Sequence, residues 1–223
     1  MRMIKPLLSS LLFFVGLSVF GEEEVDLPHY LLVAPEGMEE APVDRVRNWM
    51  ASNLHYEVRL LRLPSWEGES AGEQAEALNA LPAENVIATV VMAETLEEGK
   101  HAVLIPDRRL GFIHVPLLYQ EASETHLRRL DRQAIRIVGF SLGVPPQPMP
   151  FCALAPYQTV EELDRIGRGF SPPAMAQYRR QLIENGFPLS PDAERLLPDV
   201  RVRMPDPAPV ADPTDHTDKV DAP

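Results

Sequence analysis

Short apolar runs alternate with amphipathic segments in the first part of the chain. The runs at 30–35 and 56–63 have the length and composition of strands, and each precedes a segment of helical periodicity, at 43–53 and 72–81. A third run, at 86–92, has the β-branched content of a central strand. Because strands that alternate with helices form mostly parallel sheets, the pattern predicts an α/β fold with helices on the faces of a sheet.

Two further apolar runs, at 101–106 and 112–118, flank the turn sequence DRRLG and predict a β-hairpin. Pro116 interrupts the second run, and proline favours a sheet edge because it cannot donate a hydrogen bond to a neighbouring strand. We therefore expect a mixed (α+β) twisted sheet that ends in an exposed edge strand within Gly111 to Leu118.

The longest helical pattern begins near Ser123 and runs into the sequence GFSLG at 139–143. Its apolar positions recur at three- and four-residue steps: Leu127, Leu130, Ala134, Ile137, Val138 and Leu142. Gly143 stands where a left-handed residue ends a helix, and the four prolines between 145 and 150 prevent continuation. Shorter helical stretches are predicted at 160–168, 173–185 and 191–197.

The two ends of the chain differ in composition from its middle. Two basic residues precede an apolar run from Leu7 to Phe20, and small Gly21 precedes three glutamates, so residues 1–21 resemble a secretory signal peptide. The run is shorter than the roughly 20 residues that span a bilayer. We therefore expect a soluble exported protein, periplasmic or extracellular, with an uncleaved anchor as the alternative. We assign the folded domain to residues 22–200 and a disordered tail, rich in proline and aspartate, to residues 201–223.

The net charge argues against nucleic acids and anionic membranes as partners, and the cysteine content excludes an intrachain disulfide. The chain has 33 acidic and 21 basic residues, a formal net charge of −12. Nucleic acids and anionic membrane surfaces attract basic patches, so we expect neither as a partner, apart from the signal segment at a membrane. Cys152 is the only cysteine, so no intrachain disulfide can form. The histidines before the tail lack ligand spacing and are interpreted as surface or core residues: His29, His55, His101, His114 and His126.

Ser141 lies in a G-x-S-x-G sequence, the pattern of a hydrolase nucleophile. A nucleophile elbow needs a strand before the serine and a helix directly after it, whereas here a helical pattern precedes Ser141 and prolines follow. The only downstream histidine is His216, in the acidic tail. We interpret Ser141 as a residue of a last helical turn, and Cys152 as a buried small hydrophobe. A serine or cysteine hydrolase that uses one of them is the alternative.

A helix that ends at glycine before a proline-rich turn resembles the active-site helix of the metzincin zinc proteases, with their motif HExxHxxGxxH. The residues that follow, QPMPFCALAPYQTVEELDRIGRGFSPPA, resemble the archaemetzincins in particular. The alignment sets Gly143 on the motif's glycine. It sets Arg136 on the first histidine, Ile137 on the glutamate, Phe140 on the second histidine and Pro146 on the third.

The same alignment covers the cysteines and the methionine turn of the archaemetzincins. Gln147 falls on the first cysteine, Cys152 on the second and Leu154 on the methionine. The distal cysteine pair falls around Ser171 to Met175, where this chain has none. Between them VEELDRIGRGF is similar to the family's acidic, arginine-containing linker. The resemblance is specific from Arg136 to Pro172.

The resemblance implies a metzincin-like fold without the family's chemistry. In the family the three histidines hold a catalytic zinc and the glutamate is the general base. Arg136, Phe140 and Pro146 offer no electron pair, Ile137 accepts no proton, and Cys152 alone cannot hold the second zinc. We expect a twisted sheet with covering helices, an active-site-type helix ending at Gly143 and a small helical C-terminal subdomain, with no zinc or other cofactor.

The resemblance also suggests where a partner binds. In the family the strand equivalent to Gly111 to Leu118 lies along the substrate cleft, where an extended chain can pair with it. We therefore expect an inactive peptidase homologue, a pseudo-peptidase, that binds a peptide or protein at this strand. A structural or assembly protein of the cell envelope, with its acidic tail as a spacer, is the alternative from another class.

Three arginines, Arg128, Arg132 and Arg136, recur at four-residue steps and share one stripe of the predicted helix. Such a stripe is commonly a solvated polar face. The alignment suggests a second hypothesis, in which the Arg136 guanidinium lies near the former metal position and binds a carboxylate of a neighbour or of a peptide terminus.

Overall fold

A computed structural model describes residues 27–64, 70–81, 84–96, 99–121 and 123–191. The predicted signal peptide, the predicted acidic tail and all but the first residue of the predicted helix 191–197 lie outside the described residues. Among the described residues, no helix combines the length and the apolar character needed to cross a bilayer.

The core of the fold is a five-stranded mixed sheet with strand order β2-β1-β3-β5-β4. Its strands are β1 His29–Pro35, β2 Glu57–Leu63, β3 Val86–Ala93, β4 Ala102–Ile105 and β5 Leu110–His114. All neighbouring pairs are parallel except β4 and β5, which form the predicted antiparallel hairpin. The β-branched run at 86–92 does occupy the central position, with β1 on one side and β5 on the other.

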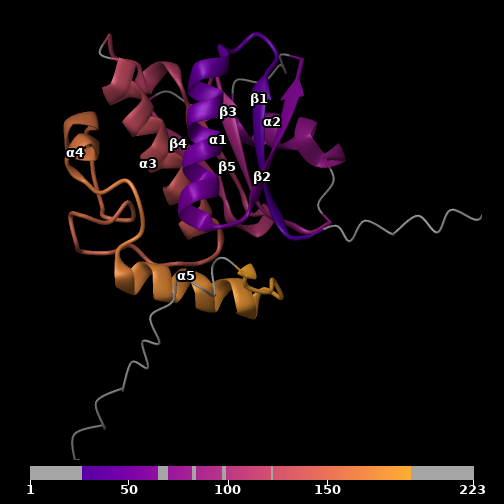
Figure 1. The fold of residues 1–223 in the computed structure, drawn as a ribbon. Coiled ribbons are helices and arrows are strands. Elements are labelled where there is room, and N and C mark those ends of the chain that lie inside the picture. Colours follow the sequence, from indigo (N-terminus) through magenta and orange to yellow (C-terminus); the bar gives the residue numbers. More distant parts are fainter. Residues whose placement is uncertain (1–26, 65–69, 82–83, 97–98, 122, 192–223) are drawn as a thin grey trace, which may run out of the picture.

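Helices cover both faces of this sheet, as the alternating pattern predicts. Helices α1 (Glu40–Leu54) and α3 (Ser123–Ser141) pack beside each other on one face, and α2 (Ala71–Ala77) with the following 3₁₀ turn η1 (Leu78–Ala80) covers the other (Figure 1). Side chains of β1 alternate between the two cores, Leu32 towards α1 and Leu31 towards α2. The predicted α/β fold class is confirmed.

The predicted position of the sheet edge is wrong. Strand β5 is an inner strand, bonded to β3 on one side and to β4 on the other, so the edge on this side of the sheet is β4. Pro116 lies beyond the end of β5, in the first position of the 3₁₀ turn η3 (Pro116–Leu118). Because Pro116 lies in the turn after the strand and is not part of it, its missing N–H carries no information about the sheet edge. The hairpin turn contains a third 3₁₀ turn, η2 (Pro106–Arg108).

The chain after α3 forms a small helical region. Helix α4 (Val160–Arg165) lies to one side, and α5 (Pro172–Glu184) crosses the end of the sheet where the parallel strands begin (Figure 1). The buried hydroxyl groups of Tyr30 in β1 and Tyr178 in α5 hydrogen-bond to each other.

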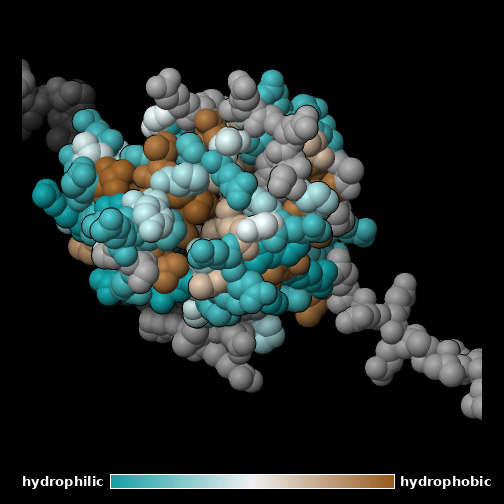
Figure 2. Space-filling view, turned by 90° about the horizontal axis from the view of Figure 1, so that it is seen from above, coloured by the Kyte–Doolittle hydropathy of each residue, from teal (hydrophilic) through white to brown (hydrophobic). Residues whose placement is uncertain are grey.

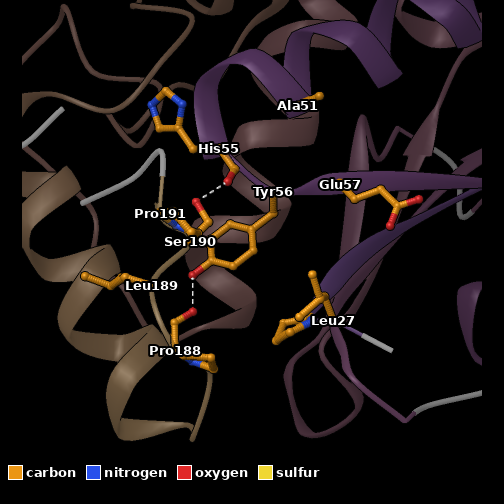
Figure 3. A pocket seen from close by; sticks show the side chains of 10 residues that line it. Leu27, Ala51, His55, Tyr56, Glu57, Pro188, Leu189, Ser190 and Pro191 are labelled. Atoms are coloured by element: carbon orange, nitrogen blue, oxygen red, sulfur yellow. Dashed lines mark hydrogen bonds between the residues drawn. The ribbon is translucent and has the colours of Figure 1, made fainter. Parts of the chain in front are cut away.

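The segment after α5 is fixed against the start of β2. The Tyr56 hydroxyl donates to the carbonyl of Pro188 at 2.7 Å, and the Ser190 hydroxyl to that of His55 at 2.5 Å (Figure 3). A pocket of about 420 Å³ remains between this segment, the end of α1 and Leu27. The C-terminal region is therefore part of the same packed unit as the sheet.

Candidate functional site

Helix α3 ends as the sequence predicts. Gly143 adopts a positive φ of 81°, and its N–H donates to the carbonyl of Phe140 at 3.0 Å. The N–H of Val144 donates to the carbonyl of Gly139 at 2.9 Å, which completes a Schellman cap. The chain then turns back beneath the helix, because Gly139 leaves room for the side chain of Leu154: a Cβ on Gly139 would lie 2.8 Å from Leu154 Cδ2.

Arg136 points from α3 into this turn and bonds to its main chain. Its Nη1 atom donates to the carbonyl oxygens of Ala153 at 2.5 Å and of Ala155 at 2.6 Å. Burial lowers the pKa of the Arg136 guanidinium, and no described carboxylate contacts it. The hypothesis that Arg136 binds a neighbouring carboxylate is therefore wrong for the described residues, because carbonyl groups of the turn accept its hydrogen bonds.

Aromatic rings flank the Arg136 guanidinium and continue towards the sheet edge. The Arg136 Cζ atom lies 5.1 Å from the ring centroid of Phe140 and 4.7 Å from that of Tyr157. The ring of Tyr157 in turn stacks with that of His101, with centroids 5.9 Å apart and planes 11° apart. We call Phe140, Arg136, Tyr157 and His101 the guanidinium stack. It connects α3, the turn below it and the residue that precedes β4.

A further buried side chain holds the guanidinium stack in place, and burial shifts the pKa values of its Tyr157 and His101 side chains. Buried Gln133, one turn before Arg136, donates from Nε2 to the Tyr157 hydroxyl at 2.5 Å. Burial raises the pKa of the Tyr157 hydroxyl. Burial, with the nearby charge of Arg129, lowers the pKa of the His101 imidazole. Both aromatic groups are therefore favoured in their neutral forms beside the permanent cation.

The expectation of a solvated arginine stripe is wrong for two of its three members. Arg132 is buried and donates to the carbonyls of Ile166 and Asp164, each at 2.9 Å, and Arg136 belongs to the stack. Only Arg128 is solvated, with 52% of its side chain exposed and an ion pair to Glu124. The stripe turns inward because the segment 153–166 lies over it and supplies main-chain acceptors.

The other residues aligned with the catalytic motif have separate positions. Ile137, at the place of the general base, is 3% exposed and packs on Gly111 of β5, where an added Cβ would lie 2.6 Å from Ile137 Cγ2. Pro146, at the place of the third histidine, is exposed. The neighbouring Gln147 is buried, and its N–H donates to the carbonyl of Leu154 at 3.1 Å. The structure thus brings Arg136 and Phe140 together, whereas Pro146 lies exposed beyond the end of α3.

The two hydrolase candidates are both buried. Ser141 is the last residue of α3, as its interpretation as a last-turn residue requires, and its hydroxyl has no hydrogen-bond partner among the described residues. Cys152 is fully buried, and its Sγ accepts a hydrogen bond from the N–H of Ser171 at 3.4 Å. Leu154 is also fully buried. Neither Ser141 nor Cys152 hydrogen-bonds to a basic side chain of the described residues, so the geometry does not favour a hydrolase that uses them.

The sequence did not predict three of the site residues: Tyr157, Gln133 and His101. They are far apart along the chain, and the acceptors of Arg136 are main-chain groups, which no motif encodes. One signal was available, since Gln133 and Arg136 are three residues apart and therefore share a face of the predicted helix.

The residues present do not fit a catalytic zinc ion. Zinc takes imidazole, thiolate or carboxylate ligands, whereas the three residues aligned with the zinc ligands are an arginine, a phenylalanine and a proline. Within the part of the chain that the structure describes, no group of three or more histidine, cysteine, aspartate or glutamate side chains could hold a metal ion.

Comparisons with known proteins concern the fold. No protein-family model matches the sequence, and no curated protein is significantly similar to it. The archaemetzincin of Methanopyrus kandleri is 17% identical with a TM-score of 0.61, over 72% of this chain and 98% of that one. The archaemetzincin of Archaeoglobus fulgidus, complexed with malonate, is 16% identical with a TM-score of 0.55, over 66% and 99%. A zinc-dependent peptidase of Methanocorpusculum labreanum is 14% identical with a TM-score of 0.54, over 66% and 99%. The chain therefore has the fold of the archaemetzincin zinc peptidases.

Proposed function

We propose that this protein is an exported, non-catalytic homologue of the archaemetzincins that binds extended peptide or protein segments. The observation that carries the proposal is the bonding of the Arg136 guanidinium to the carbonyls of Ala153 and Ala155. A permanent cation of the protein occupies the helix position that the resemblance assigns to the first zinc ligand. Its hydrogen bonds hold the turn against α3, so the position has a structural role.

The lack of a general base supports the same proposal. A peptidase of this class needs a carboxylate next to its metal-bound water to accept a proton. Here Ile137 is packed against Gly111, where a carboxylate would be desolvated without a partner. The proposal of export rests on the composition of residues 1–21.

Strand β4 supplies the binding edge of this proposal. The N–H of His114 donates to the carbonyl of His101, so the hydrogen-bonded pairs of the hairpin are His101 with His114 and, two residues on, Val103 with Phe112. The main-chain groups of Ala102 and Leu104 therefore point away from β5, towards the open edge. An extended segment can bond to these groups by β-augmentation.

We predict that the purified full chain binds no stoichiometric zinc and cleaves no peptide in a chelator-sensitive manner. The measurements are elemental analysis after equilibration with zinc and dialysis, and a peptidase assay with a mixed peptide substrate, beside an active metallopeptidase as the positive control. One zinc per chain, together with cleavage that a chelator abolishes, would show that the proposal is wrong.

We predict that replacing the outward amide of β4 weakens peptide binding without unfolding the protein. Leu104→Pro removes an N–H that faces the open edge, where proline is tolerated. Leu104→Ala shortens the same side chain and keeps the N–H, so it is the matched control. On an array of short unstructured peptides, the alanine variant should bind the same peptides as the wild type. The proline variant should no longer bind them. Equal binding by both variants would exclude β4 as the pairing strand.

A further inference from the structure

A hollow of about 690 Å³ lies at the end of the sheet where the parallel strands finish. Loops after β1, β3 and β5 and the starts of α1 and α3 line it, among them Glu39, Pro42, Glu94, Glu121 and Leu127. After β1 the chain leads to β2 on one side, and after β3 it leads to the β4–β5 hairpin on the other. Crevices at such a reversal of direction are where open α/β sheets bind ligands.

This hollow is distinct from the guanidinium stack and from the β4 edge. It meets α3 at Leu127, whereas Arg136 lies nine residues further on, roughly 13 Å along the helix. No residue of the stack lines the hollow. Binding in this hollow is therefore independent of the peptide binding proposed for β4.

The floor of the hollow is apolar, and the apolar surface extends beyond its rim. Met38, Pro42, Val115 and Leu127 line it and are each half-buried, and Pro116 lines it from an exposed position. The adjoining turn also exposes two large apolar side chains, Leu117 (39% exposed) and Tyr119 (66%). Figure 2 shows this end of the molecule, with hydrophobic side chains gathered in a depression and bordered by hydrophilic ones. A volume of this size suits a small organic group or a few side chains of a peptide.

The charged side chains around the hollow are acidic. Glu39, Glu94 and Glu121 come from three different loops and are exposed. None of the three forms an ion pair or a hydrogen bond through its carboxylate with another described residue. No lysine or arginine is among the described residues that line the hollow, and His126 is held by a hydrogen bond between its Nδ1 atom and the carbonyl of Leu118. Among the described residues, the rim therefore presents three carboxylates without a paired cation above an apolar floor.

We propose that this hollow binds a ligand that carries an ammonium or guanidinium group on an apolar body. The apolar body displaces water from the floor formed by Met38, Pro42 and Leu127. The cationic group lies at the rim, where the carboxylates of Glu39, Glu94 and Glu121 attract it and repel an anionic ligand of the same shape. A free amine and a basic side chain next to an apolar residue of a peptide share this chemistry.

The test compares ligands that share one body and differ in charge. The probes are 3-phenylpropylamine, 3-phenylpropanol and 3-phenylpropionate, titrated into the full chain and followed by NMR chemical shifts. At low salt the amine should bind at least about ten times more tightly than the carboxylate, and the affinity of the alcohol should lie between the two. Added salt should reduce the ratio of the amine's affinity to the carboxylate's. A lysine-containing and a glutamate-containing dipeptide of phenylalanine, used in the same way, distinguish a peptide from a free amine as the source.

Variants of the protein test whether the amine binds in this hollow and whether its preference depends on the rim carboxylates or on the net charge alone. The triple variant Glu39→Gln, Glu94→Gln and Glu121→Gln should bind the three phenylpropyl probes with similar affinity. The control is Glu84→Gln, Glu161→Gln and Glu184→Gln, which changes the net charge equally at exposed positions outside the hollow and should keep the preference for the amine. Ala41→Trp, which fills the hollow from an exposed position of α1, should abolish binding. No binding of the amine, no preference over the carboxylate, or an unchanged preference in the first triple variant would each overturn the proposal.

Discussion

Arg136→Ala is expected to destabilise the protein by about 2 to 3 kcal/mol, measured by urea unfolding of the full chain. The substitution removes both hydrogen bonds that the carbonyls of Ala153 and Ala155 accept from this side chain. It also removes the cation between the rings of Phe140 and Tyr157 and leaves a void there. The cost is large because main-chain carbonyls that are shielded from water lose their hydrogen-bond donors. At an exposed site, water takes over the hydrogen bonds of the group that lost its partner.

Two further variants separate this structural role from a general effect of charge. Arg128→Ala removes a cation from the same helix, but this side chain is exposed and paired with Glu124, so the expected loss is about 0.5 kcal/mol or less. Arg136→Lys keeps a charge and hydrogen-bond donors but loses the planar faces that contact the rings, so its stability should lie between those of the wild type and Arg136→Ala. If Arg136→Ala and Arg128→Ala unfold at the same urea concentration, Arg136 does not hold the turn.

Most of the fold could be predicted because its signals are local. The strand runs, the helical steps of α1 and α3 and the hairpin turn each appear within a short window of the sequence. The end of α3 at Gly143 could be predicted because one residue with a positive φ, followed by prolines, determines where a helix stops.

The order of the strands was harder to predict than their existence. Pro116 suggested an edge at β5, but periodicity cannot show whether a proline lies inside a strand or directly after it. The strand that does form this edge, β4, is four residues long, and Pro106 follows it directly, so a proline near the end of an apolar run does not identify the edge strand.

The candidate site could be predicted only in its helix positions. The alignment places Arg136 and Phe140 one turn apart on the same helix, and in the structure the Arg136 guanidinium does lie beside the Phe140 ring. Their partners come from distant segments: the carbonyls of Ala153 and Ala155, the ring of Tyr157 and the ring of His101. The inward direction of Arg132 and Arg136 follows from where the later segment packs, which helical periodicity does not determine.

The turn that accepts the hydrogen bonds of Arg136 depends on a glycine in another segment. The N–H of Gly167 donates to the carbonyl of Pro150 at 2.8 Å, and the N–H of Ala153 donates to that of Gly169 at 2.8 Å. The two segments lie so close that a Cβ on Gly167 would be 1.9 Å from the carbonyl oxygen of Phe151 and 2.3 Å from its carbon. These are main-chain atoms, so no side-chain rotation can relieve the overlap.

Gly167→Ala is therefore expected to destabilise the protein by about 3 kcal/mol or more, or to prevent folding. If the variant folds, the displaced turn should also weaken the bonds of Arg136, so that Arg136→Ala costs less in the Gly167→Ala background than in the wild type. Gly72→Ala is the matched control, because Gly72 lies in α2 with no atom closer than 3.9 Å to the added Cβ, and alanine there should stabilise the helix by about 0.5 kcal/mol or more. Wild-type stability of Gly167→Ala would mean that the segment from Ile166 to Gly169 does not press on the turn, and that the acceptors of Arg136 are held in place by other contacts.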